Sequence, residues 1–381
     1  MRFYVSVAAV TLFSFLAMSN PNNATTDQSS HTKYLVYIGS YGKGVYGFRF
    51  DSASARLEPL GMVGPVVNPS WVTAGPDYKH LYAVSELEKV QGAIAAFGIN
   101  HKTGALTPVN SEPSGGEAPC YAAVDHTGKM LIVANYVTGG VSSYPIQRDG
   151  RIGRMVSLMT ASGQGPNKAR QDGPHAHEAV IAADNKRVYV PDLGLDHIRI
   201  YRLDPENAKL LPNDPPYVQQ EGGSGPRHLV FGKNGKYAYL LSEIKPLLTV
   251  LRHDEGNGSL QIVQSVATLP NDFSGESTGA EIRLDPSGRF LYASNRGADT
   301  IQVFAVDPGN GTIRMIQSIP TGGKTPRGFA LDPTGQYLFA GNQDSNTLVL
   351  MNIDRNTGKL AATGKTFDVP SPVDVLFVPA Q

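Results

Sequence analysis

Residues 173–201 read GPHAHEAVIAADNKRVYVPDLGLDHIRIY and contain every feature that recurs along the chain. A glycine and a proline open the stretch, a short apolar run follows, a polar turn reverses the chain, and a second apolar run ends at a polar pair. Similar openings occur as GPRHL at 225–229, GAEIR at 279–283 and TPRGF at 325–329. Self-similarity at a regular spacing is typical of repeat proteins. The chain is therefore predicted to be built from one repeated unit.

Each unit is predicted to be a four-stranded antiparallel sheet. Turn sequences such as DPSG at 285–288 and DPTG at 332–335 separate a first short strand from a second, FLYAS at 290–294 in one copy. A third strand alternates in polarity, as TIQVFAVD does at 300–307, and a further hairpin leads to a fourth. Glycine-containing turns between β-branched and aromatic runs are hairpin signals. No segment shows a helical period.

Seven units are expected in a closed ring. The openings recur about every 46 to 55 residues, the range of propeller blades. The last opening is followed only by VDVLFV at 373–378, and the strands that it lacks are YLVYIG at 34–39 and VYGFRFD at 45–51. A blade shared by both termini would leave no open sheet edge. The fold is thus predicted to be all-β, a seven-bladed β-propeller. Its openings are Pro69, Pro119, Pro174, Pro226, Gly279, Pro326 and Pro372.

The N-terminus is expected to lie outside this domain. Residues 1–19 have one arginine and then an apolar run, which is typical of a secretory signal peptide and too short for a convincing spanning helix. Residues 20–32 are rich in Asn, Ser and Thr and are predicted to be a disordered leader. The propeller then covers 33–381. The mature protein is expected to be periplasmic or secreted without a membrane span, and cytoplasmic if the signal is not cleaved.

Charge and cysteine content exclude several functions. The chain has 33 basic and 33 acidic residues, and its one basic cluster, 168–170, is too short for a nucleic-acid interface. Cys120 is the only cysteine, so neither an internal disulfide nor a cysteine zinc site can form. We interpret Cys120 as a small buried side chain.

Two columns of the repeat alignment vary from blade to blade in their polar residues, which favours a pocket over a purely structural ring. The first strand of a propeller blade lies nearest the axis, so residues around its start can line the mouth of a central channel. The position after each opening holds Ser70, Cys120, His175, Arg227, Ala280, Arg327 and Val373, and the end of the second strand holds Tyr41, Glu86, Tyr136, Leu193, Glu243, Arg296 and Gln343. We also consider the residue that directly precedes each member of the second column. From these three sets we select six candidate substrate-binding residues: Glu86, Asp192, Asn295, Arg296, Arg327 and Gln343.

His175 and His177 lie two residues apart on an extended segment and are expected to face the same side. In the alignment His177 replaces an apolar residue. It can be a buried histidine bonded to a neighbouring blade, an acid or base at the channel mouth, or a metal ligand, although nothing in the sequence identifies a third ligand. Arg227 and Glu243, sixteen residues apart in one blade, are expected to form an ion pair.

At these motifs the sequence resembles the lactonase family of seven-bladed propellers, which includes the cycloisomerase-type 6-phosphogluconolactonases and the muconate-type cyclases. The resemblance extends from about Tyr34 to the C-terminus. It implies an active site of histidine, arginine and glutamate at the channel mouth. The matching residues are His175 or His177, with Arg227, Glu243 and, as a second arginine, Arg296.

The reaction implied by the resemblance is hydrolysis of a sugar-type lactone, with a small-molecule lactone or carboxylate as partner. An arginine can stabilise the oxyanion of the tetrahedral intermediate, and a histidine or glutamate can transfer the protons. No organic cofactor is needed and no metal site is predicted. Two alternatives stay open: the reverse, lactone-forming cyclase reaction, and a non-enzymatic exported propeller that binds a ligand or a protein. The sequence does not determine the oligomeric state.

Overall fold

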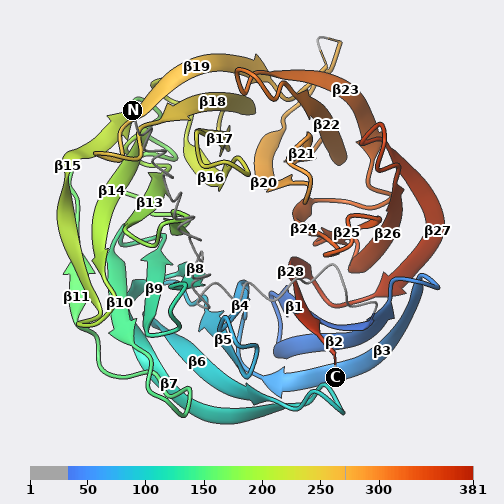
Figure 1. Ribbon diagram of the computed structural model, residues 1–381, viewed down its shortest axis with the longest axis horizontal. Helices are drawn as coiled ribbons and strands as arrows, with labels where there is room; N and C mark the ends of the chain where they lie inside the picture. The colour runs from blue at the N-terminus through green and yellow to red at the C-terminus, as the bar shows by residue number, and fades with distance from the viewer. Residues whose placement is uncertain (1–32, 271, 381) are drawn as a thin grey trace, which may run out of the picture.

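The computed structural model describes residues 33–270 and 272–380, which form 28 strands arranged as seven four-stranded sheets. The expected signal peptide and leader lie outside the described residues. Neighbouring strands within each sheet are antiparallel. None of the described segments forms a helix that could cross a lipid bilayer. The sheets surround a common axis, which confirms the predicted seven-bladed propeller (Figure 1).

The innermost strand of every blade is its first in the repeat (Figure 1). These inner strands are β4 (Val72–Ala74), β8 (Pro119–Val124), β12 (Val180–Ile181), β16 (Pro226–Phe231), β20 (Thr278–Leu284), β24 (Pro326–Leu331) and β28 (Pro372–Pro379). The second strands are β1 (Lys33–Ser40), β5 (His80–Ser85), β9 (Met130–Asn135), β13 (Arg187–Asp192), β17 (Tyr237–Ser242), β21 (Phe290–Arg296) and β25 (Tyr337–Asn342).

The remaining two strands of each blade lie farther from the axis. The third strands are β2 (Gly44–Asp51), β6 (Gln91–Ile99), β10 (Val141–Pro145), β14 (His197–Asp204), β18 (Leu247–His253), β22 (Thr300–Val306) and β26 (Thr347–Ile353). The outer strands are β3 (Arg56–Pro65), β7 (Leu106–Glu117), β11 (Ser157–Met159), β15 (Lys209–Gln219), β19 (Leu260–Ala267), β23 (Ile313–Pro320) and β27 (Leu360–Asp368).

The two ends of the propeller share one blade, as the sequence predicts. β28 supplies the inner strand and pairs antiparallel with β1, from Tyr34 opposite Pro379 to Ile38 opposite Val375 (Figure 1). This pairing closes the ring of blades.

The turns between first and second strands form because an aspartate binds the backbone that follows it. In the turn at 332–335 the Asp332 carboxylate accepts hydrogen bonds from the backbone N–H groups of Thr334, Gln336 and Tyr337. Gly335 has φ of 68°, a left-handed conformation that glycine adopts without strain. The expected turn chemistry is confirmed.

The core is formed between adjacent blades. Phe50 of β2 packs edge to face against Phe339 of β25 in the next blade, with ring centroids 4.9 Å apart. Trp71, just before β4, stacks on Tyr121 of β8 at 4.0 Å. Each large apolar side chain buried in this way contributes about 1.5 to 3 kcal/mol. The blades are therefore held at fixed angles around the axis, which fixes the positions of the inner-strand side chains.

Several inner strands begin with a β-bulge. The register with the second strand shifts between Pro119 and Tyr121, between Pro226 and His228, and between Pro326 and Gly328. A bulge leaves one residue unpaired and bends the strand, which changes where side chains point. The unpaired residues here are Cys120, Arg227 and Arg327, and all three line the central cavity described below.

Candidate active site

A narrow cavity lies on the axis at the N-terminal ends of the inner strands, and its volume of about 10 Å³ has room for about one water-sized group. Five of the seven residues that follow the openings line this cavity, and His175 and Ala280 do not. Its walls come from most of the blades, and its lining residues are Ser70, Trp71, Glu86, Cys120, His177, Arg227, His228, Glu281, Arg327 and Val373.

In the blade that contains the two histidines, the predicted alignment of the repeat is displaced by two residues. Ala176 pairs with Asp192, as Pro226 pairs with Ser242 in the next blade, so His177 and not His175 occupies the position of Arg227. The physical reason is that the glycine and proline at 173–174 lie two residues too early in the chain: the His175 carbonyl accepts from the Leu193 N–H, as the Gly225 carbonyl accepts from the Glu243 N–H in the next blade. His177 is therefore a member of the polar ring.

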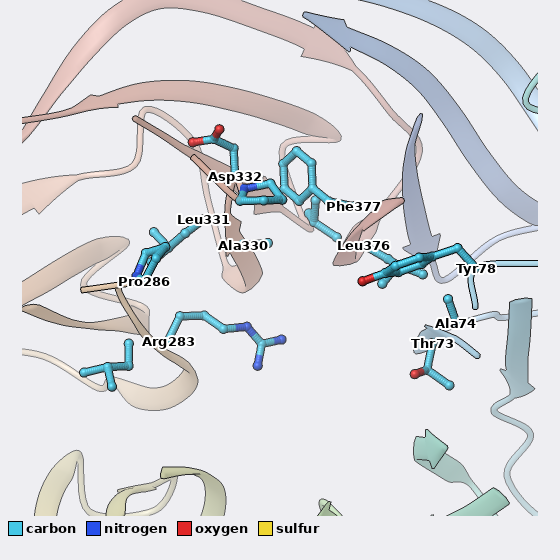
Figure 2. Close-up of a pocket in the computed structure, with 13 residues that line it drawn as sticks. Thr73, Ala74, Tyr78, Arg283, Pro286, Ala330, Leu331, Asp332, Leu376 and Phe377 are labelled. Carbon is cyan, nitrogen blue, oxygen red and sulfur yellow. The ribbon is translucent and has the colours of Figure 1, made fainter. Parts of the chain in front are cut away.

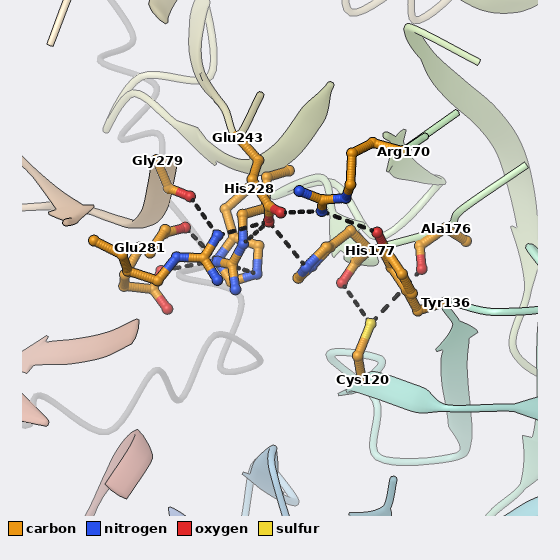
Figure 3. A network of polar contacts seen from close by, with 12 residues as sticks. Cys120, Tyr136, Arg170, Ala176, His177, His228, Glu243, Gly279 and Glu281 are labelled. Carbon is orange, nitrogen blue, oxygen red and sulfur yellow. Dashed lines mark hydrogen bonds and ion pairs between the residues drawn. The ribbon is translucent and has the colours of Figure 1, made fainter. Parts of the chain in front are cut away.

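A buried carboxylate is the centre of the site. Oε2 of Glu243, which follows β17, lies 2.9 Å from Nε of Arg227 and 2.9 Å from Nη2 of Arg296 (Figure 3). Arg227 is also held by the carbonyl of Ala280, to which its Nη1 donates a hydrogen bond. The expected Arg227–Glu243 ion pair is confirmed, and Arg296 from the neighbouring blade joins it.

A third arginine reaches the same carboxylate from a loop. Arg170 lies between β11 and β12, and its Nη2 donates to Oε1 of Glu243 and to the hydroxyl of Tyr136 (Figure 3). The loop is fixed by Gln171, whose fully buried side chain donates to the carbonyl of Leu193. The Arg170 side chain is 40% exposed, against 2% for Arg227. It is therefore the arginine that an entering ligand can contact first.

This group of residues carries a surplus of positive charge. Burial alone would raise the pKa of Glu243, but Arg296, Arg227, His177 and Arg170 together hold it well below the usual value. Glu243 therefore stays ionised. Burial lowers the pKa of Arg296 to about 10, which leaves it protonated at neutral pH. Three guanidinium groups face one carboxylate, so two positive charges remain to attract an anion or a developing oxyanion.

His177 is a neutral imidazole beside the carboxylate. Burial, with the charges of Arg227 and His228, holds its pKa well below the usual value. Its Nε2 is 3.9 Å from Oε2 of Glu243, which favours the tautomer that carries the proton on Nε2. Nδ1 is buried and has no hydrogen-bond partner among the described residues. The imidazole thus has a lone pair free to accept a proton.

His175 lies apart from this group. Its ring stacks on Tyr136 with centroids 4.7 Å apart, and its two nitrogens lie 2.9 Å from the carbonyl of Tyr136 and 3.1 Å from Oδ1 of Asp172. Both ring nitrogens therefore have partners outside the cavity.

Below the site, a second tier supports Arg227. His228 lies 3.4 Å from Nη1 of Arg227 through Nε2 and 3.1 Å from Oε1 of Glu281 through Nδ1. Glu281 in turn pairs with Arg283 at 3.2 Å. The contact between His228 and Glu281 joins β16 to β20 of the neighbouring blade.

The other candidate substrate-binding residues fall into two groups. Arg327 and Glu86 line the cavity. Asn295 and Asp192 are fully buried and do not line it: Asn295 bonds to Thr268, and Asp192 binds backbone N–H groups and lies 3.2 Å from Arg199. Gln343 is half-buried and its backbone N–H donates to Thr325.

Within residues 33–270 and 272–380, no cluster of three or more His, Cys, Asp or Glu side chains is arranged to hold a metal ion. Cys120 is buried and its thiol lies 3.3 Å from the carbonyl of His177. Burial raises the pKa of this thiol. Cys120 is thus a small buried side chain packed behind the histidine.

Comparison with known proteins shows to which family this chain belongs. The model of the seven-bladed β-propeller lactonase family matches residues 35–377. The chain belongs to this family. It is 34% identical over 351 residues to a Bacillus subtilis protein named 6-phosphogluconolactonase, covering 91% of this chain and 99% of the relative.

Two further proteins are similar to this chain over most of its length. A Formosa agariphila protein of the same name is 33% identical over 304 residues, covering 77% of this chain and 85% of its own length. The solved structure of a periplasmic gluconolactonase from Pseudomonas aeruginosa superposes with a TM-score of 0.86 at 32% identity, covering 92% of this chain and all of the other.

A wider pocket lies at the opposite end of this lactonase-family ring. It is lined by the C-terminal ends of β4, β20, β24 and β28 and by the turns that follow them, with Arg283 projecting into it from the side opposite Thr73 and Tyr78 (Figure 2). Since all inner strands run in the same direction along the axis, this pocket and the Glu243 site face opposite ends of the channel.

Arg170 is the site residue that sequence reasoning missed. It was considered only as part of a basic cluster too short to bind nucleic acid. One signal was available: the loop that carries it directly precedes GPHAH, so it leads into the mouth of the channel.

Proposed function

We propose that this protein hydrolyses a sugar-type lactone, as a 6-phosphogluconolactonase does, at the mouth formed by His177, Arg227, Glu243 and Arg296. The observation that carries the proposal is the surplus of two positive charges beside a buried neutral histidine with a free ring nitrogen. The names of the relatives, 6-phosphogluconolactonase and gluconolactonase, support the same reaction.

In the first step water adds to the lactone carbonyl. The carbonyl oxygen points toward Arg227 and Arg296, which stabilise the negative charge as the carbon becomes tetrahedral. One proton of the water passes to Nδ1 of His177. The resulting imidazolium lies beside the ionised Glu243, which stabilises it by charge.

In the second step the tetrahedral intermediate collapses. The bond between the carbonyl carbon and the ring oxygen breaks, and the ring oxygen leaves as an alkoxide. His177 returns the proton to this oxygen, which yields a hydroxy acid and regenerates the neutral imidazole. The overall reaction consumes one lactone and one water, so no cofactor is required for balance.

Glu243 acts in this scheme as a positioning residue. Its low pKa makes it a poor base, and both of its oxygens are taken by arginines. It fixes the guanidinium groups of Arg227 and Arg296 before the substrate arrives, so that no reorganisation is needed when charge develops. Arg170, half-exposed at the rim, is assigned to an anionic group of the substrate such as a phosphate.

The proposed location is the periplasm or the exterior of the cell. The basis is Arg2 with the apolar run from Val5 to Met18, and a relative whose structure is described as a periplasmic gluconolactonase. Fractionation of cells that express the full chain, with N-terminal sequencing of the product, tests it. Removal of about the first 19 residues is expected; an intact N-terminus in the cytoplasmic fraction would overturn it.

The reaction is tested with purified protein and a panel of lactones that includes 6-phosphogluconolactone, glucono-δ-lactone and δ-valerolactone. Acid release is followed with a pH indicator at a pH where the uncatalysed rate is low. Turnover of the phosphorylated sugar lactone above the neutral ones is expected. A folded protein that hydrolyses none of them would overturn the proposal and favour the lactone-forming or ligand-binding alternative.

A further inference from the structure

The cavity wall opposite Glu243 carries polar atoms that the protein itself leaves without partners. Oγ of Ser70 and Oε2 of Glu86 are buried and have no hydrogen-bond partner among the described residues, and both residues line the cavity. A buried polar group without a hydrogen-bond partner destabilises the fold. Native proteins keep such groups mainly where a ligand or water completes them.

An unpaired cation completes this wall. The guanidinium of Arg327 lies 5.1 Å above the ring of Tyr41, and no hydrogen bond or ion pair joins it to another described residue. The hydroxyl of Tyr41 donates to Oε1 of Glu86 at 2.9 Å, which fixes that carboxylate and leaves Oε2 toward the cavity. Tyr41, Glu86 and Arg327 thus form one continuous surface from three different blades.

We propose that Ser70, Glu86 and Arg327 form a subsite that recognises the hydroxyl groups of a polyhydroxylated substrate. A carboxylate oxygen accepts from one hydroxyl, a guanidinium N–H donates to the oxygen of its neighbour, and a serine hydroxyl can do either. The three groups therefore match adjacent hydroxyls on a sugar chain or ring.

Charge and space distinguish this ligand from an anion. Glu86 offsets the positive charge of Arg327, whereas two positive charges are unbalanced on the Arg170 and Arg296 side. The cavity is also narrow, with a volume of about 10 Å³, so that only a group as small as a hydroxyl can enter it. An anionic group is therefore directed to the rim at Arg170, and a hydroxyl group to the cavity.

This inference rests on the proposed function for the orientation of the substrate. With the carbonyl at Arg227 and Arg296 and the anionic group at Arg170, the hydroxyl-bearing edge of a sugar lactone faces Ser70 and Glu86. A lactone without hydroxyl groups would leave both side chains buried and unsatisfied, which disfavours its binding.

The test measures ligand binding and not turnover, so its result does not depend on whether the protein hydrolyses lactones. Gluconate and hexanoate are both six-carbon carboxylates, and only gluconate carries hydroxyl groups on the chain. Isothermal titration calorimetry with each acid is carried out on the wild type, Ser70→Ala and Glu86→Gln. Thr73→Ala, three residues after Ser70 at the opposite end of the channel, is the matched control.

The wild type is expected to bind gluconate more tightly than hexanoate. Ser70→Ala should reduce that preference about 3- to 10-fold and Glu86→Gln about 10- to 100-fold, as the loss of a neutral and a charge-assisted hydrogen bond predicts. Thr73→Ala should retain it. Melting curves show whether each variant is folded. If Glu86→Gln is unstable, the binding preference of Ser70→Ala, the smaller substitution, is used instead.

The outcomes separate the two proposals. A wild type without preference for gluconate, or a preference that both variants retain, overturns the hydroxyl subsite even if lactones are hydrolysed. A preference that depends on Ser70 and Glu86 supports the subsite even if no lactone is hydrolysed, in which case the proposed reaction fails alone.

Discussion

Glu243 and Arg296 lie in neighbouring blades and meet at the axis, with Oε2 of the glutamate 2.9 Å from Nη2 of the arginine. The same oxygen lies 2.9 Å from Nε of Arg227. One carboxylate therefore holds two cations from different blades in fixed positions, and it links the stability of the ring to the geometry of the site.

Replacing Glu243 by glutamine should affect both stability and activity. The three arginines would lose their counter-charge and repel one another, and removing one partner of a buried ion pair costs about 3 to 5 kcal/mol. A lower melting temperature and strongly reduced lactone hydrolysis are expected. Glu255→Gln, an exposed glutamate on an outer turn, is the control and should change neither. A Glu243→Gln protein with wild-type melting temperature and rate would contradict the role given to this carboxylate.

Arg170→Gln should alter substrate preference more than the chemical step. Arg170 is the half-exposed arginine at the rim, so the loss of its charge-assisted hydrogen bonds should lower kcat/KM for 6-phosphogluconolactone about 10- to 100-fold. The effect on glucono-δ-lactone, which has no phosphate, should be much smaller. Lys168→Gln, exposed on the same loop, is the matched control. Equal losses on both lactones would argue against phosphate recognition by Arg170.

The pH profile should reflect the environment of His177. Burial and the nearby arginine hold its pKa well below 6.5, and the reaction requires the neutral form. Activity should therefore be constant as the pH falls to 6.5 and should decline only at distinctly lower pH. The measurement is kcat/KM against pH with corrected background hydrolysis. An acid limb with an apparent pKa at or above 6.5 would contradict the assignment of His177 as the base.

The contribution of Glu178 to thermal stability should fall as the pH rises above about 5. Burial and the neighbouring Glu281 raise the pKa of Glu178 in the folded protein to about 8, against 4.5 for the unfolded chain. The folded state thus binds more protons than the unfolded state between these values, and each step upward in pH favours unfolding. Glu178→Gln keeps an acceptor for the Leu229 N–H and should flatten this dependence. Parallel slopes for variant and wild type between pH 5 and 8 would show that Glu178 is not responsible.

The fold was predictable because its signals are local and repeated. The aspartate turns at Asp285 and Asp332, the alternating strands and the divided terminal blade can all be read directly from the sequence. The Arg227–Glu243 pair was also predictable, because the start of the first strand and the end of the second strand lie at the same end of each blade.

The sequence could not show which of the two histidines occupies the position of Arg227 in the repeat. In the blade that contains His177 the glycine and proline of the opening lie two residues earlier than in the next blade, and only the pairing of Ala176 with Asp192 reveals this. Nor could it place Arg170, because a loop outside the repeat has no equivalent in the other blades to be aligned with. Both results depend on tertiary contacts that no local pattern encodes.

Substitution of the two histidines tests most directly whether His177 transfers the proton. His175→Gln and His177→Gln are two residues apart, and only His177 is assigned to proton transfer. The rate of 6-phosphogluconolactone hydrolysis should fall about 10²- to 10⁴-fold in His177→Gln, the usual contribution of a general base, and only a few-fold in His175→Gln. Full activity in His177→Gln, or a greater loss in His175→Gln, would contradict the proposed site.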